Sequence, residues 1–283
     1  MSLIVASKGI AEVVMGHWKE IMLRGAVIPF QQVAMLREQV ATLRGSSSNE
    51  ERMRHELARF GAMLHENGFV AATDGNLSVR LEDGRVMITP SGFSKGMMEA
   101  RDMVIVDPSG KKLSGSHNAS SEIQMHLAIY QDRRDVNAVV HAHPCTATAF
   151  ACSGIALEEP ICAEVVMTLG RVPLAPYGTT GTPELTTNIR PFIADHSAIL
   201  LANHGVVTYA EDLLTAYLKM EAVEHFAKVT LAARQIGAPQ VLNAVQLDAL
   251  EVAKQRYLNR RPTKAPQPEL TFAFALSQLA RRN

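Results

Sequence analysis

The sequence predicts one α/β domain with a helical extension before it and a tail after it. Short runs of alternating hydrophobic residues, typical of strands, are interleaved with longer segments whose hydrophobic residues recur at helical spacing. The chain has 283 residues, of which 47% are hydrophobic and 20% charged, as in ordinary globular proteins. We therefore expect an extension over 1–48, a domain over 49–258 and a tail over 259–283.

The extension carries hydrophobic residues at helical spacing on both sides of Pro29. Packing on the domain or on a neighbouring subunit is a more economical explanation than a catalytic role. The polar segment 46–49 offers caps for a helix that is expected to end at Gly68.

Within the domain, a Glu-Asp-Gly turn at 82–84 indicates a β-hairpin. The tail begins with a basic, proline-rich stretch over 259–268. The expected elements, in order, are strands over 76–80, 85–88 and 103–107, a helix over 121–131, a strand over 136–143, a helix over 182–194, a strand over 198–202 and a helix over 213–234.

Composition excludes several classes of partner. Lys plus Arg and Asp plus Glu each total 28, and this balance predicts no binding to nucleic acid or to an anionic membrane. An anionic ligand would need a local site. The chain has three cysteines and no CxxC pair, lacks a signal peptide pattern, and has no run of eighteen apolar residues. We expect a cytoplasmic protein.

His141-Ala142-His143 is the sharpest motif in the sequence. On a strand, residues two apart lie on the same face, about 7 Å apart along the chain, so two imidazoles can converge on one ion. His204 directly follows a second apolar strand. Three histidine nitrogens with one position left open are typical of a catalytic zinc site. We predict a metal site at His141, His143 and His204.

Five of the other histidines fall on expected helices. His126 lies one turn after Glu122 on the same helical face, and a structural role is slightly favoured over a role supporting the site. Surface or packing roles are expected for His17, His55, His65 and His225.

A second group of residues lies where turns or loops meet regular elements: Gly75-Asn76, Ser91-Gly92 and Ser120-Ser121. Backbone N–H groups and hydroxyls at such positions bind an anion without a fixed positive charge. Taken singly, each is equally explained as a turn or cap residue. Glu122 follows the serine pair at a helix start. An isolated Glu there is usually a dipole partner, whereas beside a metal it could be a ligand or a base.

Six motifs that include these residues occur in order within 50–235. Together they resemble the class II aldolase/adducin family, and within it the L-fuculose-1-phosphate aldolases. The motifs are 74–80 (DGNLSVR), 89–92 (TPSG), 120–122 (SSE), 141–144 (HAHP), 175–177 (APY) with Gly181-Thr182, and His204-Gly205.

The resemblance implies an α/β/α three-layer fold with a mixed or antiparallel central sheet, and a homotetramer with fourfold symmetry whose active sites lie at subunit interfaces. His141, His143 and His204 would hold Zn²⁺, with Mn²⁺ or Co²⁺ as other possibilities. Glu122 would be the acid/base. The phosphate of a sugar substrate would bind to Asn76, Ser91, Gly92, Ser120 and Ser121.

The function that the resemblance implies is a zinc-dependent aldolase of carbohydrate metabolism. It would join dihydroxyacetone phosphate to a small aldehyde, or cleave the product, through an enediolate. Two departures concern the tyrosines of the aldolases. Glu164 lies in the segment where one is expected, and Tyr257 is the only nearby candidate for the other.

Three alternatives remain. A metal-dependent decarboxylase on the same scaffold is the main rival, because it would share the enolate-type intermediate and would not need the missing tyrosine. A sugar-phosphate 4-epimerase is less expected, since such epimerases carry Asp where this chain has Glu122. A non-catalytic adducin-like module is least expected, because it has no use for an open metal site.

Overall fold

The fold is known from a computed structural model, which describes residues 49–260. The predicted extension over 1–48 and the part of the predicted tail beyond residue 260 lie outside the described residues. Among the helices that are described, none is long and apolar enough to cross a membrane.

An eight-stranded sheet forms the centre of the domain, in the order β4-β3-β2-β1-β5-β8-β7-β6. Neighbouring strands are antiparallel except β6 and β7, which are parallel. The strands are β1 (Asn76–Arg80), β2 (Val86–Ile88), β3 (Val104–Val106), β4 (Lys112–Ser114), β5 (Ala138–Ala142), β6 (Leu174–Ala175), β7 (Ala198–Leu201) and β8 (Gly205–Ala210).

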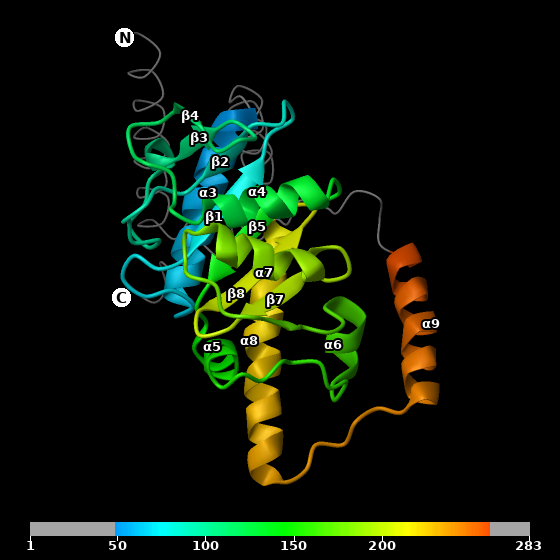
Figure 1. The fold of residues 1–283 in the computed structure, drawn as a ribbon. Coiled ribbons are helices and arrows are strands. Elements are labelled where there is room, and N and C mark those ends of the chain that lie inside the picture. The colour runs from blue at the N-terminus through cyan, green and yellow to red at the C-terminus, as the bar shows by residue number, and fades with distance from the viewer. Residues whose placement is uncertain (1–48, 261–283) are drawn as a thin grey trace, which may run out of the picture. The chain divides into compact units, whose positions relative to one another are not determined.

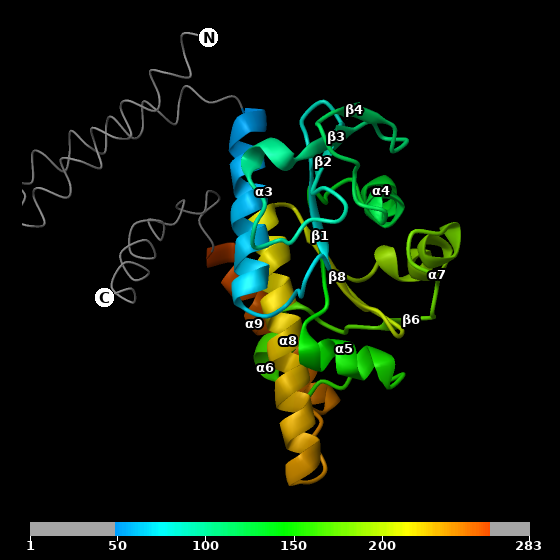
Figure 2. The same cartoon turned by 90° about the vertical axis from the view of Figure 1, so that its left-hand side faces the viewer.

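Helices cover both faces of this sheet, as Figures 1 and 2 show. One face packs against α3 (Asn49–Glu66), α5 (Cys145–Cys152), α6 (Ala163–Thr168) and α8 (Leu213–Ile236). The other packs against α4 (Ile123–Asp132) and α7 (Pro183–Ile193). Successive strand residues enter opposite cores, so that Val140 joins the first and Val139 the second. The predicted α/β/α domain with a mixed sheet is confirmed.

The strand register gathers the predicted site residues at one end of the sheet. In the β1–β5 pair, Asn76 lies opposite His141. In the β5–β8 pair, His141 lies opposite Val207. β7 and β8 form a hairpin in which Leu201 pairs with Gly205, so His204 lies in the turn at that same end.

The sequence did not predict β4, α5, α6, β6, β8 or α9 (Ala244–Arg260). All six residues of β8 are buried, so this strand has no alternation of polar and apolar residues to reveal it. β6 has only two residues and α6 only six, too few for a period to appear. α9 packs against α6.

Candidate metal centre

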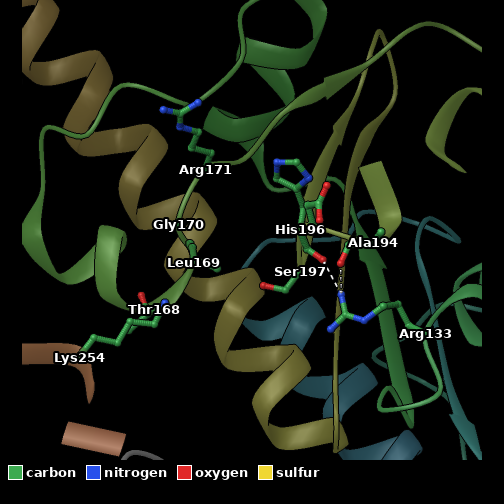
Figure 3. A pocket seen from close by; sticks show the side chains of 10 residues that line it. Arg133, Thr168, Leu169, Gly170, Arg171, Ala194, His196, Ser197 and Lys254 are labelled. Atoms are coloured by element: carbon green, nitrogen blue, oxygen red, sulfur yellow. Dashed lines mark hydrogen bonds between the residues drawn. The ribbon is translucent and has the colours of Figure 1, made fainter. Parts of the chain in front are cut away.

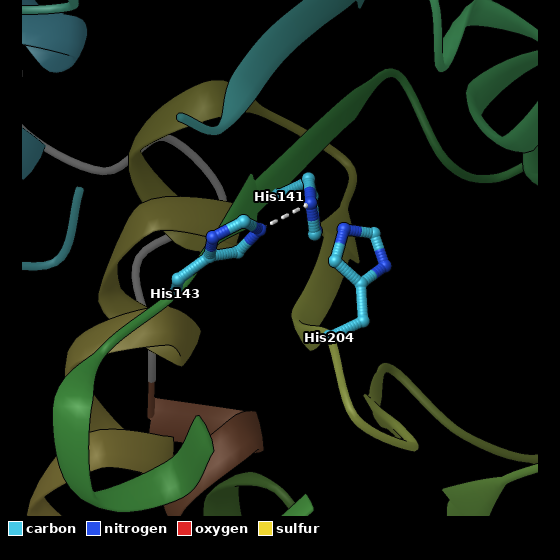
Figure 4. A group of neighbouring side chains, drawn as sticks. All are labelled: His141, His143 and His204. Atoms are coloured by element: carbon cyan, nitrogen blue, oxygen red, sulfur yellow. Dashed lines mark hydrogen bonds between the residues drawn. The ribbon is translucent and has the colours of Figure 1, made fainter. Parts of the chain in front are cut away.

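Three histidines meet at the end of the sheet where β5 finishes. His141 is the fourth residue of β5 and is fully buried, and His143 follows the strand directly. His204 comes from the β7–β8 turn. One ligand atom from each ring lies within 4.8 Å of the other two, and Figure 4 shows the rings turned toward one another. These are the three histidines in which the sequence predicted a metal site.

Two glycines allow this close approach. A Cβ on Gly205 would lie 2.4 Å from Cδ2 of His143 and 2.7 Å from the carbonyl oxygen of Ala142. Gly75 has a φ of 71°, and its Cβ would lie 2.8 Å from the carbonyl oxygen of His141. Any larger residue would therefore push the loop before β1 or the β7–β8 turn away from the histidines.

The carboxylate of Glu122 completes the cluster. Its Oε2 lies 3.2 Å from Nε2 of His141, and its Oε1 lies 3.4 Å from Nε2 of His204. The Nε2 atoms of His141 and His143 are 3.0 Å apart. Ligand atoms around a tetrahedral zinc ion, at about 2.0–2.1 Å from it, lie about 3.3 Å from one another. The observed separations therefore suit a divalent ion bound among these side chains.

The outer nitrogens of two of the rings support the same reading. Nδ1 of His141 donates to the carbonyl oxygen of Val206 at 2.9 Å, so its Nε2 faces the other side chains of the cluster. Nδ1 of His143 lies 3.4 Å from Oδ2 of Asp74. Metal-binding histidines usually orient their second nitrogen in this way, toward a carbonyl or a carboxylate.

Two buried polar atoms of the cluster have no hydrogen-bond partner within residues 49–255: Oε1 of Glu122 and Nδ1 of His204. Buried polar atoms are nearly always paired, so an unpaired one needs an explanation. A bound ion or substrate beside the carboxylate would provide one for Glu122. The donor set, three imidazoles and a carboxylate, is one that zinc and related ions prefer.

The pKa shifts in the cluster differ from one histidine to the next. Burial lowers the pKa of His204 to about 3, and burial together with the charge of His141 lowers that of His143, so both rings are neutral at pH 7. Burial opposes ionisation of Glu122, but the imidazoles of His141 and His204 and the amide of Asn76 outweigh it and hold its pKa below the usual range. For His141, burial is outweighed by Glu122, and its pKa is raised.

Glu122 stands at the N-cap position of α4, which begins two residues later than the helix predicted from 121. Its Oε2 accepts a hydrogen bond from Nδ2 of Asn76 at 2.8 Å. Asn76 was predicted to bind phosphate. It is only 4% exposed, and its amide already contacts Glu122 on one side and, through Oδ1, the ring of His126 on the other. One amide hydrogen is left for a ligand.

The other residues of the predicted anion site lie on two adjoining loops. The backbone N–H of Ser91 donates to Asn118 and that of Ser120 donates to Thr89, at 3.0 and 3.2 Å. Gly92, which has a φ of 77°, is exposed, and Ser121 is exposed as well. Ser120 is buried, and its Oγ accepts the N–H of Glu122 at 3.3 Å. The loops are thus joined to each other and to Glu122.

Lys95 was not predicted to matter. Its side chain is 1% exposed, and Nζ donates to the carbonyl oxygens of Thr73, at 3.0 Å, and Phe93. It ties the loop before Asn76 to the loop after Gly92. Burial lowers the pKa of Lys95 to about 8. No sequence pattern indicates that a lysine in a polar loop will be buried.

A hollow of about 410 Å³ lies elsewhere, next to Ser197 before β7, whereas His204 follows β7 (Figure 3). It is lined mainly by polar residues, including Arg133. The guanidinium of Arg133 donates to the carbonyl oxygens of Ile193, Ala194 and His196 at 3.1–3.2 Å, and pairs with Asp135 at 2.7 Å. These contacts fix the end of α7, and the hollow has no part in the histidine cluster.

The two positions that depart from the aldolase pattern differ in what is known of them. Glu164 lies in α6 with an exposed side chain, and its Oε2 lies 3.5 Å from Sγ of Cys162. Tyr257 belongs to α9, but its side chain lies outside the described part of the chain.

Comparisons with known proteins agree with the expected family. Residues 55–231 match the family described as Class II Aldolase and Adducin N-terminal domain. A 3-oxo-tetronate 4-phosphate decarboxylase of Pectobacterium atrosepticum is 35% identical over 188 residues, which are 65% of this chain and 86% of that protein. A 5-deoxy-D-ribulose 1-phosphate aldolase of Bacillus thuringiensis is 33% identical over 202 residues, 71% of this chain and 94% of that protein.

A solved structure of an L-fuculose 1-phosphate aldolase shares the fold. It superposes with a TM-score of 0.68 at 34% identity, covering 75% of this chain and 98% of that one. The resemblance predicted from six short motifs is confirmed over most of the described domain. The chain belongs to the class II aldolase and adducin family.

Proposed function

We propose that the chain is a zinc-dependent aldolase that cleaves or forms a C–C bond between dihydroxyacetone phosphate and a small aldehyde. The observation that carries this proposal is the meeting of three histidines and one carboxylate, with ligand atoms within 4.8 Å among the histidines and Glu122 within 3.2–3.4 Å of two of them. Such a cluster has lone pairs that form no hydrogen bond within the fold and can therefore bind an ion. The proposed substrate resembles L-fuculose 1-phosphate.

His141, His143 and His204 would hold the ion, which when bound acts as a Lewis acid on the substrate's carbonyl group. Glu122 would remove the proton from C3 of dihydroxyacetone phosphate. The electron pair left on C3 forms an enediolate and then attacks the aldehyde carbon, whose oxygen takes up a proton. In cleavage the C4 hydroxyl gives up its proton and its oxygen becomes the aldehyde oxygen, the C3–C4 bond breaks with its electron pair going to C3, and Glu122 would deliver a proton there.

The exposed loops beside Glu122 would bind the phosphate. Ser91, Gly92 and Ser121 offer hydroxyl and backbone N–H donors, Ser120 supports them, and Asn76 retains one amide hydrogen. Because the chain has no net charge, these local donors would provide the affinity for an anion.

We also expect a homotetramer, which light scattering of the purified protein would test.

A metal-dependent decarboxylase is the second candidate, and one observation favours it. A relative that is 35% identical is a 3-oxo-tetronate 4-phosphate decarboxylase. Loss of carbon dioxide from a 3-oxo acid leaves the same kind of enolate, stabilised in the same manner, and needs no group to protonate an aldehyde oxygen. The segment 160–167, where the aldolases place a tyrosine, contains Glu164 and no tyrosine, and this is compatible with such a reaction.

A paired product assay would separate the candidates. The protein, reconstituted with Zn²⁺, is incubated with ketose 1-phosphates and, separately, with a phosphorylated 3-oxo acid, while dihydroxyacetone phosphate and carbon dioxide are measured together. An aldolase releases dihydroxyacetone phosphate from the first and exchanges its C3 hydrogen with deuterated water. Carbon dioxide without such exchange would replace the aldolase with the decarboxylase. Neither product, with no metal retained, would favour the non-catalytic module.

A further inference from the structure

A continuous chain of buried hydrogen bonds runs from the interior of the domain to Glu122. The hydroxyl of Tyr130 lies 2.7 Å from Oγ of Ser78, which lies 2.7 Å from Nδ1 of His126. Nε2 of His126 lies 2.6 Å from Oδ1 of Asn76, whose Nδ2 donates to Oε2 of Glu122 at 2.8 Å. Ser78 and His126 are 0% exposed, and Asn76 and Tyr130 are each 4% exposed.

The donors and acceptors of these groups allow only one direction for this series of hydrogen bonds. Nδ2 of Asn76 donates to Oε2 of Glu122, so the amide turns its oxygen toward His126. The ring nitrogen facing that oxygen, Nε2, must carry the hydrogen. Burial lowers the pKa of His126 to about 3, so the ring is neutral and Nδ1 accepts.

The directions of the remaining two hydrogen bonds follow from the same count of donors and acceptors. Ser78 uses its one hydroxyl hydrogen to donate to Nδ1 of His126, so its oxygen must accept from Tyr130. Every donor thus points toward Glu122. Hydrogen bonds aligned in series polarise one another, and each strengthens the next.

We propose that His126, supported by Ser78 and Tyr130, is a positioning residue that locks the Asn76 amide and thereby makes the two oxygens of Glu122 unequal. Oε2 is held by Asn76, and Oε1 is left to receive the substrate proton. This inference rests on the proposed function, in which Glu122 is the base.

The surroundings of the two oxygens support the division of roles. Oε2 has Asn76 at 2.8 Å and His141 at 3.2 Å. Oε1 has no hydrogen-bond partner within residues 49–255 and lies on the side of His204, at 3.4 Å. If the Asn76 amide turned over, its oxygen would face the carboxylate and its NH₂ would face the Nε2–H of His126. Both contacts would be repulsive, so His126 prevents the flip.

Two substitutions of His126 test the proposal kinetically. His126→Leu removes both nitrogens, whereas His126→Gln keeps an amide donor near the position of Nε2. We expect His126→Leu to lower kcat by about 10- to 100-fold with KM little changed and metal content intact, and His126→Gln to recover most of the loss. Unchanged kcat in a folded, metal-loaded His126→Leu protein would overturn the proposal.

A double-variant cycle separates positioning from simple structural support. If His126 acts through Glu122, adding His126→Leu to Glu122→Gln should cause no further loss of turnover. Equal losses in both backgrounds would indicate a purely structural effect. Tyr130→Phe should cause a smaller loss than His126→Leu. Its matched control is Tyr209→Phe. This variant removes another buried hydroxyl, which donates to the carbonyl oxygen of Ile193 at 3.2 Å and does not belong to the hydrogen bonds that lead to Glu122. It should leave kcat unchanged.

A measurement on the resting protein distinguishes failure of this inference from failure of the proposed function. Nitrogen-15 NMR of the imidazoles should show His126 as the neutral Nε2–H tautomer at pH 7, with or without Zn²⁺, and Asn76→Ala should shift that resonance. An Nδ1–H tautomer or an imidazolium would overturn the inference even in an active aldolase. The predicted tautomer in a protein that turns over neither substrate class would leave the hydrogen-bond chain standing and discard the proposed reaction.

Discussion

The two ends of the β1–β5 strand pair are both rich in polar side chains, yet they differ in how these are used. At the end formed by Arg80, the guanidinium donates to the carbonyl oxygens of Tyr130, Arg133, Arg134 and Val136. At the end where Asn76 lies opposite His141, Glu122 and His204 each keep a buried polar atom without a hydrogen-bond partner in the described residues.

This difference separates polar groups that hold the fold from polar groups that can do chemistry. Arg80 donates to carbonyl oxygens in the last turn of α4 and in the segment that follows it, so these bonds hold the fold together. Burial alone does not mark a site. Glu224 is 3% exposed, but its carboxylate accepts the backbone N–H groups of Thr146 and Ala147 at 2.9–3.1 Å and so caps α5. Unused lone pairs, gathered at one point, are the better sign.

The largest effect is expected from Glu122→Gln. The substitution keeps the shape but removes the base, so turnover should fall by about 100- to 10,000-fold while the three imidazoles keep the metal. Steady-state kinetics and metal analysis of the same preparation measure both. Glu224→Gln is the matched control, because it alters a similarly buried carboxylate that caps α5 and pairs with Lys228, and its turnover should stay near that of the unaltered protein. Full activity in Glu122→Gln would remove Glu122 from the mechanism.

His143→Ala should remove most of the bound metal and, with it, the activity. His143 is one of the three proposed imidazole ligands, and two imidazoles hold a divalent ion far less firmly than three. Elemental analysis after dialysis gives the answer, with circular dichroism to establish that the protein is folded. His225→Ala, at an exposed position on α8, should retain a full complement of metal. Stoichiometric metal in the His143 variant would refute the ligand assignment.

Much of the fold could be predicted because strong local patterns coincide with the real elements. The strand over 76–80 is found with the same bounds, and the long helix begins at Leu213 as predicted and ends at Ile236. The helix predicted from 121 begins at Ile123, since Ser121 and Glu122 belong to the turn before it. β8 was missed because a strand buried on both faces carries no alternation.

The candidate site likewise has a part that could be predicted from the sequence and a part that could not. His141, His143 and His204 could be predicted, because each lies in or next to a strand whose pattern is local. The contacts that orient them could not. His141 meets Val206 across 65 positions, and His126 meets Asn76 across 50, only through the register of antiparallel strands and the packing of α4. A structural role was slightly favoured for His126, and its bond to Asn76 is compatible with that role and with the positioning role proposed above.

At the opposite end of the strand pair, Arg80→Met should act on stability and not on activity. Its loss leaves several carbonyl oxygens without their charged donor, which we expect to lower the free energy of unfolding by about 1.5–3 kcal/mol. Urea unfolding and kcat are measured on the same variant. Arg101→Met, whose exposed side chain pairs with Glu99 at 3.0 Å, should change stability very little. A large fall in kcat for folded Arg80→Met would show that the two ends are coupled.

The smallest effect is expected from Ser121→Ala, which tests whether the exposed loop beside the histidines is a phosphate site. Ser121 is exposed and directly precedes Glu122, so its hydroxyl is free to meet a ligand that the carboxylate also reaches. Loss of one hydrogen bond to a charged phosphate costs about 1.5 kcal/mol, which corresponds to roughly a tenfold rise in KM for a phosphorylated substrate. An unphosphorylated analogue lacks that contact, and its KM should stay the same in the variant. Because Ser121 would contact the phosphate in the ground state and the transition state alike, kcat for the phosphorylated substrate should also be nearly unchanged. Equal rises in KM for both substrates would instead mean that Ser121 supports the position of Glu122, and the phosphate would have to bind elsewhere.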